Sequence, residues 1–138
     1  MDTIVTNHQR LSVISRETTW EEVNDLDLLN RLKKAAGTAW TKAAGLSAIQ
    51  IGIPLRFSWY KWGEDEFTLM NPKILEFKGK CKRLEEGCLS IPKTWLKIPR
   101  YYKIKYMNDG KVLTAKGYHA QIIQHEIDHM NGILITHI

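Results

Sequence analysis

The 138-residue sequence has only two cysteines and no long apolar run. No stretch approaches the ~20 apolar residues that a membrane-spanning helix needs. The start of the chain has neither the basic residues nor the apolar segment of a secretory signal peptide. We therefore expect a cytoplasmic protein without a membrane partner. In that reducing compartment, Cys81 and Cys88 suit metal binding or catalysis better than a disulfide.

Repeats, low-complexity segments and linkers are also lacking, which predicts a single domain over residues 1–138. A chain of this length can bury roughly two thirds of its unfolded surface in one core. The formal net charge is +5, and an excess of this size is more often a solvated face than a nucleic-acid surface. We expect no specific nucleic-acid partner, although such a surface would tolerate ribosomal RNA nearby.

Hydrophobic periodicity predicts a mixture of helices and short strands. A threonine cap predicts a helix start at Thr18–Glu22, an apolar stripe predicts a longer helix over Leu26–Ala43, and a last helix should begin around Tyr118. Residues Met1–Arg16 indicate a strand or an irregular arm. Alternation and turn residues predict strands at Arg56–Trp62, Phe67–Met70, Lys73–Lys78, Cys81–Glu85, Tyr101–Met107 and Lys111–Lys116.

The segment from Ala44 to Gly52 breaks the helical pattern with small residues and two glycines. A tight helix-to-strand connection would explain the glycines, which also let the backbone approach a ligand closely. Such a connection does not explain Gln50, a neutral amide among apolar neighbours that needs a partner if it is buried. An amide donor that faces a site could stabilise an oxyanion.

The strongest motif is His125-Glu126-Ile127-Asp128-His129, an HExxH sequence. Residues four apart share one helix face, so His125 and His129 can offer two imidazoles to one metal ion. Glu126 then lies beside the metal and can act as general base on an activated water. The apolar residues around the motif predict a buried helix, and Asn131-Gly132 predicts its end. The motif indicates metal chemistry without specifying the reaction.

A catalytic metal site commonly has three protein ligands, so a third must lie elsewhere. Downstream of His129 there is no Asp or Glu, and His137 is two residues too late for the known HExxH-plus-His pattern. The upstream candidates are Cys81, Glu85, Glu86, Cys88 and His119. Cys88 is the best of these because a thiolate binds Zn or Fe(II) strongly and Gly87 frees the backbone beside it. Glu86 could orient a ligand or a neighbouring cation.

Three segments resemble the motifs of the peptide deformylase family, in the family's order and with similar spacing. They are Gly45–Gln50, Glu86–Ser90 and Gln124–His129, and weaker similarity reaches Met70–Pro72 and Ile98–Arg100. The resemblance implies an α+β fold in which antiparallel β-sheets pack around a central α-helix that bears HExxH, with an N-terminal helix. The chain resembles the short form of the family that some phages encode, which lacks a C-terminal helical extension.

The resemblance also implies a role for each matching residue. Cys88, His125 and His129 would bind one divalent metal, Glu126 would be general acid and base, and the Gln50 side chain and the Leu89 backbone N–H would stabilise the oxyanion. Gly45 would pair with the extended substrate, and Arg100 would pair with Glu86. Helix spacing suggests Gln121 and Ile122 for the methionine pocket, and Leu84 is a further candidate.

The sequence departs from the family pattern at three positions. Ala43 replaces a usual glycine, Ser47 replaces a usual alanine, and Trp95 stands where many bacterial members carry arginine. The first two changes are small. The third alters the expected contacts to the substrate beyond its first residue.

The function that the resemblance implies is hydrolysis of the formyl group from N-formylmethionine on nascent polypeptides, by a monomer with weak ribosome association. Fe(II) is the expected metal in the cell, with Zn or Ni in a purified sample. An HExxH zinc metallopeptidase, which would cleave internal peptide bonds, is the first alternative. A small basic RNA-binding domain that needs no metal is the second.

Overall fold

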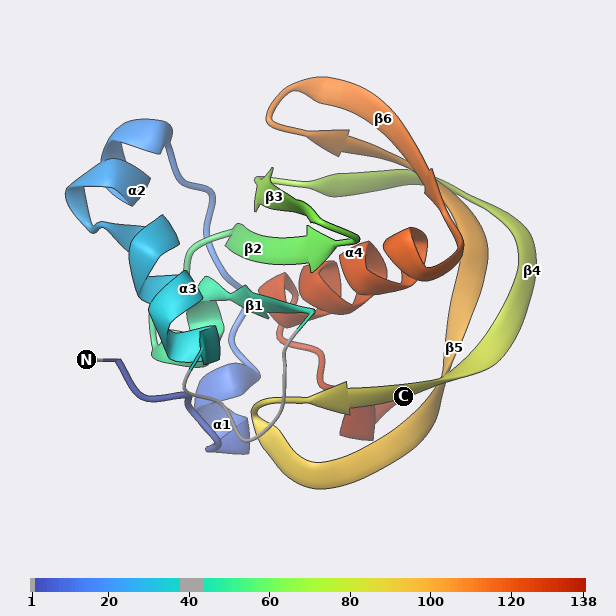
Figure 1. Ribbon diagram of the computed structural model, residues 1–138, viewed down its shortest axis with the longest axis horizontal. Coiled ribbons are helices and arrows are strands. Elements are labelled where there is room, and N and C mark those ends of the chain that lie inside the picture. Colours follow the sequence, from blue (N-terminus) through green and yellow to red (C-terminus); the bar gives the residue numbers. More distant parts are fainter. Residues whose placement is uncertain (1, 38–43) are drawn as a thin grey trace.

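The computed structural model describes residues 2–37 and 44–138. The described chain contains α-helices, two short 3-10 helices and antiparallel strands (Figure 1). In chain order the elements are α1 (His8–Leu11), α2 (Trp20–Asp25), α3 (Leu28–Gly37), β1 (Gly45–Ser47), η1 (Ala48–Ile51), β2 (Phe57–Trp62), β3 (Asp65–Met70), β4 (Lys73–Cys88), β5 (Ile91–Asn108), β6 (Lys111–Lys116), α4 (Gly117–Met130) and η2 (Ile135–His137). This combination of helices with antiparallel sheets confirms the α+β class.

The strands form two three-stranded sheets, ordered β1-β2-β3 and β4-β5-β6. All strand pairs within them are antiparallel. In the first sheet β1 is an edge strand, and Gly45 pairs with Tyr60 of β2. In the second sheet β4 and β5 are long and curve together around one end of α4 (Figure 1). Helix α4 therefore contacts strands of both sheets.

The prediction of two short strands on either side of Gly79 was wrong, because β4 is continuous from Lys73 to Cys88. Gly79 has a φ of +76°, and the pairing register with β5 shifts between Lys78 and Cys81. The glycine therefore forms a bulge that bends the strand without ending it. Both cysteines of this strand are free, with Cys81 exposed and Cys88 buried.

The N-terminal part differs from the predictions in two places. The supposed strand or irregular arm contains the short helix α1, whose first turn is capped by Asn7 accepting a hydrogen bond from the Arg10 N–H at 3.1 Å. The longer helix begins at Leu28, because Asp27 has a φ of +51° and separates it from α2. The predicted helical residues 38–43, with Ala39, Trp40 and Ala43 on the proposed stripe, lie outside the described residues.

Helix α4 forms because its apolar residues recur at helical spacing, and the side chains of Ile123 and Met130 are fully buried. They pack with Ile104 and Tyr106 of β5 in one core cluster. Burying a side chain of this size contributes roughly 1.5–3 kcal/mol. The helix ends at Met130, and Gly132 follows with a φ of +73°, as the sequence predicted. None of the helices in the described ranges is long and apolar enough to cross a membrane.

Candidate active site

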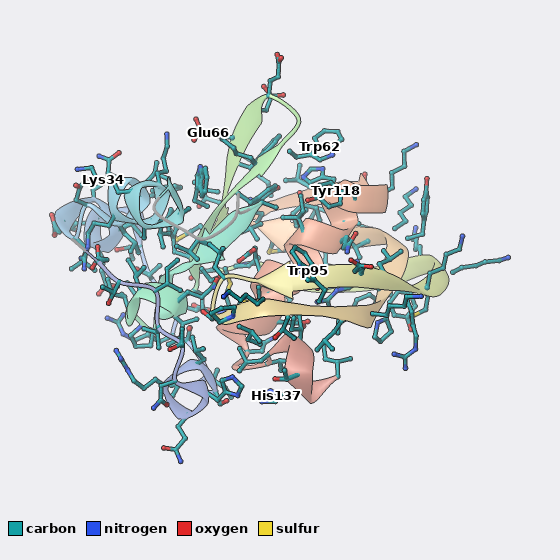
Figure 2. All side chains as sticks on the ribbon, turned by 60° about the horizontal axis from the view of Figure 1, so that its bottom comes forward. Lys34, Trp62, Glu66, Trp95, Tyr118 and His137 are labelled. Carbon is teal, nitrogen blue, oxygen red and sulfur yellow. The ribbon has the colours of Figure 1, made fainter. Side chains whose placement is uncertain are left out.

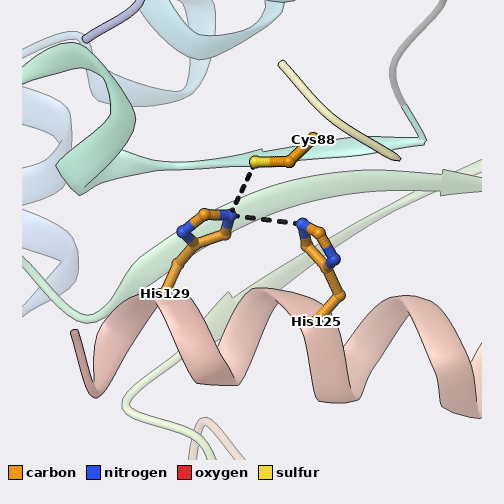
Figure 3. Close-up of side chains that lie close together, drawn as sticks. All are labelled: Cys88, His125 and His129. Carbon is orange, nitrogen blue, oxygen red and sulfur yellow. Dashed lines mark hydrogen bonds between the residues drawn. The ribbon is translucent and has the colours of Figure 1, made fainter. Parts of the chain in front are cut away.

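The two histidines of α4 and the last residue of β4 meet at one point. His125 Nε2 and His129 Nε2 are 3.2 Å apart, and Cys88 Sγ lies 3.4 Å from His129 Nε2. One ligand atom from each of the three residues lies within 4.8 Å of the other two. Figure 3 shows both rings rising from successive turns of the helix toward the thiol. Within the described part of the chain, Cys88 is the upstream candidate that joins the histidines.

The electrostatics of this cluster favour a thiolate. Burial alone would raise the pKa of the Cys88 thiol, but the neighbouring His129 and His125 lower it well below its usual value of 9.0. Burial likewise opposes the charged form of His125, whereas Cys88 and Glu86 raise the pKa of that imidazole well above 6.5. The Cys88 thiolate and the protonated His125 ring thus stabilise each other through charge.

These residues fit a divalent cation. Two imidazole nitrogens and a sulfur are donors that Fe(II), Ni and Zn accept. The Nε2 atoms of the two rings lie 3.2 Å apart, and that of His129 also lies 3.4 Å from Cys88 Sγ, so all three donors face one point. The Nδ1 atom of His129 is buried and has no hydrogen-bond partner among the described residues. Cys88, His125 and His129 are therefore the residues that could hold the metal.

Glu86 ties this cluster to a buried ion pair. Its Oε1 atom accepts a hydrogen bond from His125 Nδ1 at 2.8 Å, and the Arg100 guanidinium donates to both of its oxygens at 2.6 and 2.8 Å. Burial would raise the pKa of this carboxyl, but the hydrogen bonds from Arg100 and His125 lower it to about 2. Arg100 also donates to Asp128 at 2.6 Å. The pairing of Arg100 with Glu86 that the resemblance implied is present in the structure.

Gln121 belongs to the same network. Its Nε2 atom donates to Glu86 Oε2 at 3.2 Å and to the backbone oxygen of Glu85 at 3.3 Å. A polar residue at this wall of the site therefore has a structural reason, since its amide helps to hold Glu86 in place.

Glu126 follows His125 on α4 and is buried, with 3% of its surface exposed. Burial raises the pKa of its carboxyl above the usual 4.5, although the nearby His125 and His129 act in the opposite direction. Its Oε1 atom lies 3.0 Å from the hydroxyl of Ser47 on β1. A carboxyl whose pKa is raised toward neutrality is suited to accept and return a proton.

Gln50, on η1, lies on the other side of Cys88. Its Oε1 atom accepts a hydrogen bond from the Ser47 backbone N–H at 3.0 Å, which orients the amide. Its Nε2 atom donates to Ser90 Oγ at 3.1 Å and lies 3.7 Å from Cys88 Sγ. The amide donor therefore faces the same space as the thiol, next to Leu89.

A cavity of about 180 Å³ adjoins this cluster. Its lining contains nine of the residues predicted for the site, which are Gly45, Gln50, Glu86, Cys88, Leu89, Gln121, Ile122, His125 and Glu126. Trp95 of β5 and Tyr118 of α4 also line it, and both are largely exposed (Figure 2). The cavity is therefore polar at its base and aromatic where it meets solvent, a suitable shape for a short extended ligand.

Three predicted residues do not line the cavity, for different reasons. His129 and Arg100 are buried behind it and contact residues that do line it. Leu84 lies on strand β4 and is not among the lining residues of the cavity, so its place in the methionine pocket stays a prediction.

Sequence reasoning missed two residues of the site. Asp128, inside the HExxH motif, pairs with Arg100. Nothing in the sequence around Asp128 indicated that its partner would be an arginine 28 positions earlier. Ser47 was noted as a departure from the family pattern without a role, yet its hydroxyl contacts the buried carboxylate of Glu126. A hydroxyl in an otherwise apolar and glycine-rich segment was the available signal.

Comparison with known proteins adds independent information. The curated peptide deformylase of Thermotoga maritima is 42% identical over 96 residues, which cover 66% of this chain and 58% of the relative. The match therefore spans less than two thirds of that relative's length. A solved structure of a probable peptide deformylase from Synechococcus phage S-SSM7 superposes with a TM-score of 0.86 at 28% identity, covering 99% of this chain and 98% of the other.

A second solved structure, the Met-Ala-Ser-bound class I type b peptide deformylase of Acinetobacter baumannii, gives a TM-score of 0.84 at 25% identity, with 96% of this chain and 94% of that chain covered. The family model described as polypeptide deformylase matches residues 1–138, the full span of the sequence. With the family's three motifs converging on one cavity and the same fold in its solved members, the chain belongs to the polypeptide deformylase family.

Proposed function

We propose that this protein removes the formyl group from N-formylmethionine at the start of nascent polypeptides, with residues 1–138 forming one catalytic domain. The observation that carries the proposal is the convergence of Cys88, His125, His129 and Glu126 beside a cavity that also contains Gln50. Family membership supports the reaction type. The residue roles are those that the family resemblance implies, and the contacts described above support the roles of Glu86, Arg100 and Gln50.

The substrate is held as an added strand. β1 is an edge strand of its sheet, and Gly45 at its start lines the cavity. The backbone of β1 can therefore pair with an extended peptide, as in β-strand addition. The Met-Ala-Ser ligand of the Acinetobacter enzyme is a peptide of the expected product class. Ile122 supplies an apolar wall for the methionine side chain, while Gln121 contributes its aliphatic part.

In the first step a water molecule adds to the formyl carbon, and Glu126 accepts a proton from that water. The carbonyl oxygen becomes an oxyanion, to which the Gln50 amide and the Leu89 backbone N–H donate hydrogen bonds. The C–N bond then breaks, and Glu126 returns the proton to the leaving α-amine. The products are formate and a peptide with a free N-terminal methionine.

Cys88, His125 and His129 would hold the metal for this reaction. When a divalent cation is bound, it acidifies water and polarises a carbonyl group. The sulfur donor suits Fe(II) in the cell, and Zn or Ni in a purified sample. Glu86 fixes the His125 ring from behind, so that its Nε2 atom faces the other two donors.

The cellular setting that we propose follows from the substrate. Formylated nascent chains occur in the cytoplasm beside the ribosome, so we place the enzyme there, as a monomer with weak ribosome association. The formal charge of +5 is compatible with such a contact.

The test compares formyl-Met-Ala-Ser with unformylated Met-Ala-Ser and with an internal-peptide substrate, on protein purified without oxygen and analysed for metal. We expect stoichiometric metal, release of formate from the first peptide and no cleavage of the other two. A Glu126→Ala variant should keep its metal and lose activity, and a Cys88→Ala variant should lose the metal. Cleavage of internal bonds would favour a metallopeptidase, and activity without metal would exclude the proposal.

A further inference from the structure

We propose that Ser47 is a positioning residue that engages one carboxylate oxygen of Glu126, Oε1, and so leaves Oε2 as the oxygen that carries the proton during catalysis. The inference rests on the proposed function, since it assigns a task within the same reaction. It concerns a residue at which the chain departs from the alanine usual in the family.

Ser47 lies at the end of β1 and is fully buried. Its hydroxyl is 3.0 Å from Glu126 Oε1 and 3.2 Å from the Glu126 backbone oxygen. It also forms a hydrogen bond with the hydroxyl of Ser58, its cross-strand partner on β2, which is fully buried as well. The Ser47 oxygen therefore has three neighbours and a single hydrogen to donate.

The chemistry of these neighbours sets the direction of the bonds. An ionised carboxylate and a backbone carbonyl can only accept, so in each contact with Glu126 the Ser47 hydroxyl is the donor. The bond between the two serines must then run from the Ser58 hydroxyl to the Ser47 oxygen. This gives a chain of two hydroxyls directed at Glu126, and a donor that already accepts a hydrogen bond is strengthened by it.

The second carboxylate oxygen has different surroundings. Oε2 lies on the side of Gly45, where a Cβ atom built on that glycine would be 3.0 Å away from it. Gly45 and Glu126 both line the cavity. The glycine at position 45 therefore lets the backbone of β1 lie close to Oε2, whereas Oε1 contacts the Ser47 hydroxyl.

The two carboxylate oxygens therefore have different roles. When Glu126 takes the proton of the attacking water, Oε1 stays an acceptor for Ser47 and the proton resides on Oε2. From Oε2 the same proton is passed to the leaving amine, so no rotation of the buried carboxyl is needed between the two transfers. Ser47 acts through Glu126 and does not touch the substrate.

The same residue also sets the oxyanion donor. The Ser47 backbone N–H donates to Gln50 Oε1 at 3.0 Å. This leaves the Gln50 Nε2 atom directed toward Ser90 and Cys88. Because that bond comes from the backbone, a side-chain substitution at Ser47 should leave it in place, and the effect of the hydroxyl can be measured separately.

The experiment measures kcat and KM for formyl-Met-Ala-Ser with the metal-loaded wild-type enzyme and with Ser47→Ala and Ser58→Ala. The two substitutions remove the same group from equally buried cross-strand partners, but Ser47 alone of the two has a described contact with Glu126. We expect Ser47→Ala to lower kcat by about tenfold with little change in KM. Ser58→Ala should lower kcat by less than about threefold, because the Ser47 hydroxyl can still donate to Glu126.

A double-mutant cycle separates positioning from general damage. In a Glu126→Asp background the carboxylate is one methylene shorter and withdrawn from Ser47, so adding Ser47→Ala should change kcat by less than about twofold. Three results would each overturn the proposal. They are an equal decrease of kcat in Ser47→Ala and Ser58→Ala, a change of KM without a change of kcat, and effects of Ser47→Ala and Glu126→Asp on kcat that are fully additive. Wild-type activity on the formylated peptide shows separately whether the proposed function holds.

Discussion

His125 Nδ1 donates a hydrogen bond to Glu86 Oε1 across 2.8 Å. Because an ionised carboxylate can only accept, Nδ1 of this ring carries a proton, and Nε2 is the nitrogen that faces Cys88 and His129. The glutamate that precedes the metal-site cysteine by two residues thus orients the ring of a histidine on another element. Sequence and spacing alone could not show which of these two roles, orienting a ligand or pairing with a cation, Glu86 would have. The structure gives it both.

The first prediction is that Glu86→Gln lowers metal affinity by about 10–100-fold, because the neutral amide holds the His125 ring less firmly. Competition with a chelator, followed by metal analysis, measures the affinity. Glu76→Gln is the matched control, since Glu76 is an exposed residue of the same strand and pairs with Lys78 at the surface. An affinity equal to that of the wild type would show that Glu86 does not support the ligand.

The second prediction concerns the buried ion pair. Arg100→Met should lower the free energy of unfolding by about 3–5 kcal/mol, because Glu86 would remain buried without its cation. Urea denaturation measures the loss. Arg83→Met, at an exposed position of β4 where the guanidinium donates to a backbone oxygen, should cost much less.

A second substitution tests the cause of that loss. If the cost comes from the unpaired carboxylate, Glu86→Leu in the Arg100→Met background should recover part of the stability. If the double variant instead loses the sum of the two single decreases in the free energy of unfolding, the cost of Arg100→Met comes from lost packing around the arginine side chain.

The parts of the fold that could be predicted are those set by local sequence. The hairpin of β2 and β3, the cap at Thr19 and the end of α4 at Met130 all depend on residues within a few positions. The bulge at Gly79 was mistaken for a break because a glycine has the same local effect in both cases. β4 remains one strand because it pairs with β5 on both sides of the bulge.

The candidate site divides in the same way. The spacing of His125 and His129 sets their common face, and the motif resemblance brought Cys88, Gln50 and Arg100 to the same place. The contact of Ser47 with Glu126 depends on how β1 packs against α4, so the isolated hydroxyl in the sequence could not show its partner. Leu84 was chosen by helical spacing and lies on a strand, so its contact with the methionine side chain stays a prediction.

The third prediction tests the oxyanion donor. Gln50→Ala should lower kcat by about 100-fold, because a hydrogen bond to the developing charge is lost. Gln50→Glu keeps an acceptor for the Ser47 N–H but cannot donate when ionised, so it should be at least as impaired. Metal content should be unchanged in both variants. Substantial activity in Gln50→Ala would assign the oxyanion to other donors.

The fourth prediction concerns Gly45, where a built Cβ atom would lie 2.7 Å from Tyr60 Cβ, 2.8 Å from the Trp59 backbone oxygen and 3.0 Å from Glu126 Oε2. Gly45→Ala should therefore separate β1 from β2, displace Glu126 and reduce both stability and kcat. Gly37→Ala is the control, because no atom of the described residues lies within 4 Å of its Cβ position. Equal thermal stability and kcat in the two variants would contradict the close approach.

The fifth prediction concerns pH and His119. Its Nε2 atom lies 2.8 Å from the hydroxyl of Tyr60, and its ring stacks on Trp62 with centroids 4.5 Å apart. Burial lowers the pKa of this imidazole below 6.5. The native state therefore favours neutral His119, which can accept the Tyr60 O–H, over the cation, which cannot.

A histidine whose pKa is lower in the folded than in the unfolded state contributes stability that is complete above the unfolded value of about 6.5. That contribution is lost as the pH falls below 6.5 through the folded pKa. The free energy of unfolding should therefore decrease between pH 7.5 and 5.5 more steeply in the wild type than in His119→Gln, whose amide does not titrate. Urea denaturation at both pH values gives the change in the free energy of unfolding for each protein. Subtracting the two changes removes the contribution of the other histidines. The NMR resonance of the His119 ring, followed against pH, gives the pKa of His119 directly. A resonance that titrates at or above 6.5, or equal slopes in the two proteins, would show that the Tyr60 contact does not depend on the neutral ring.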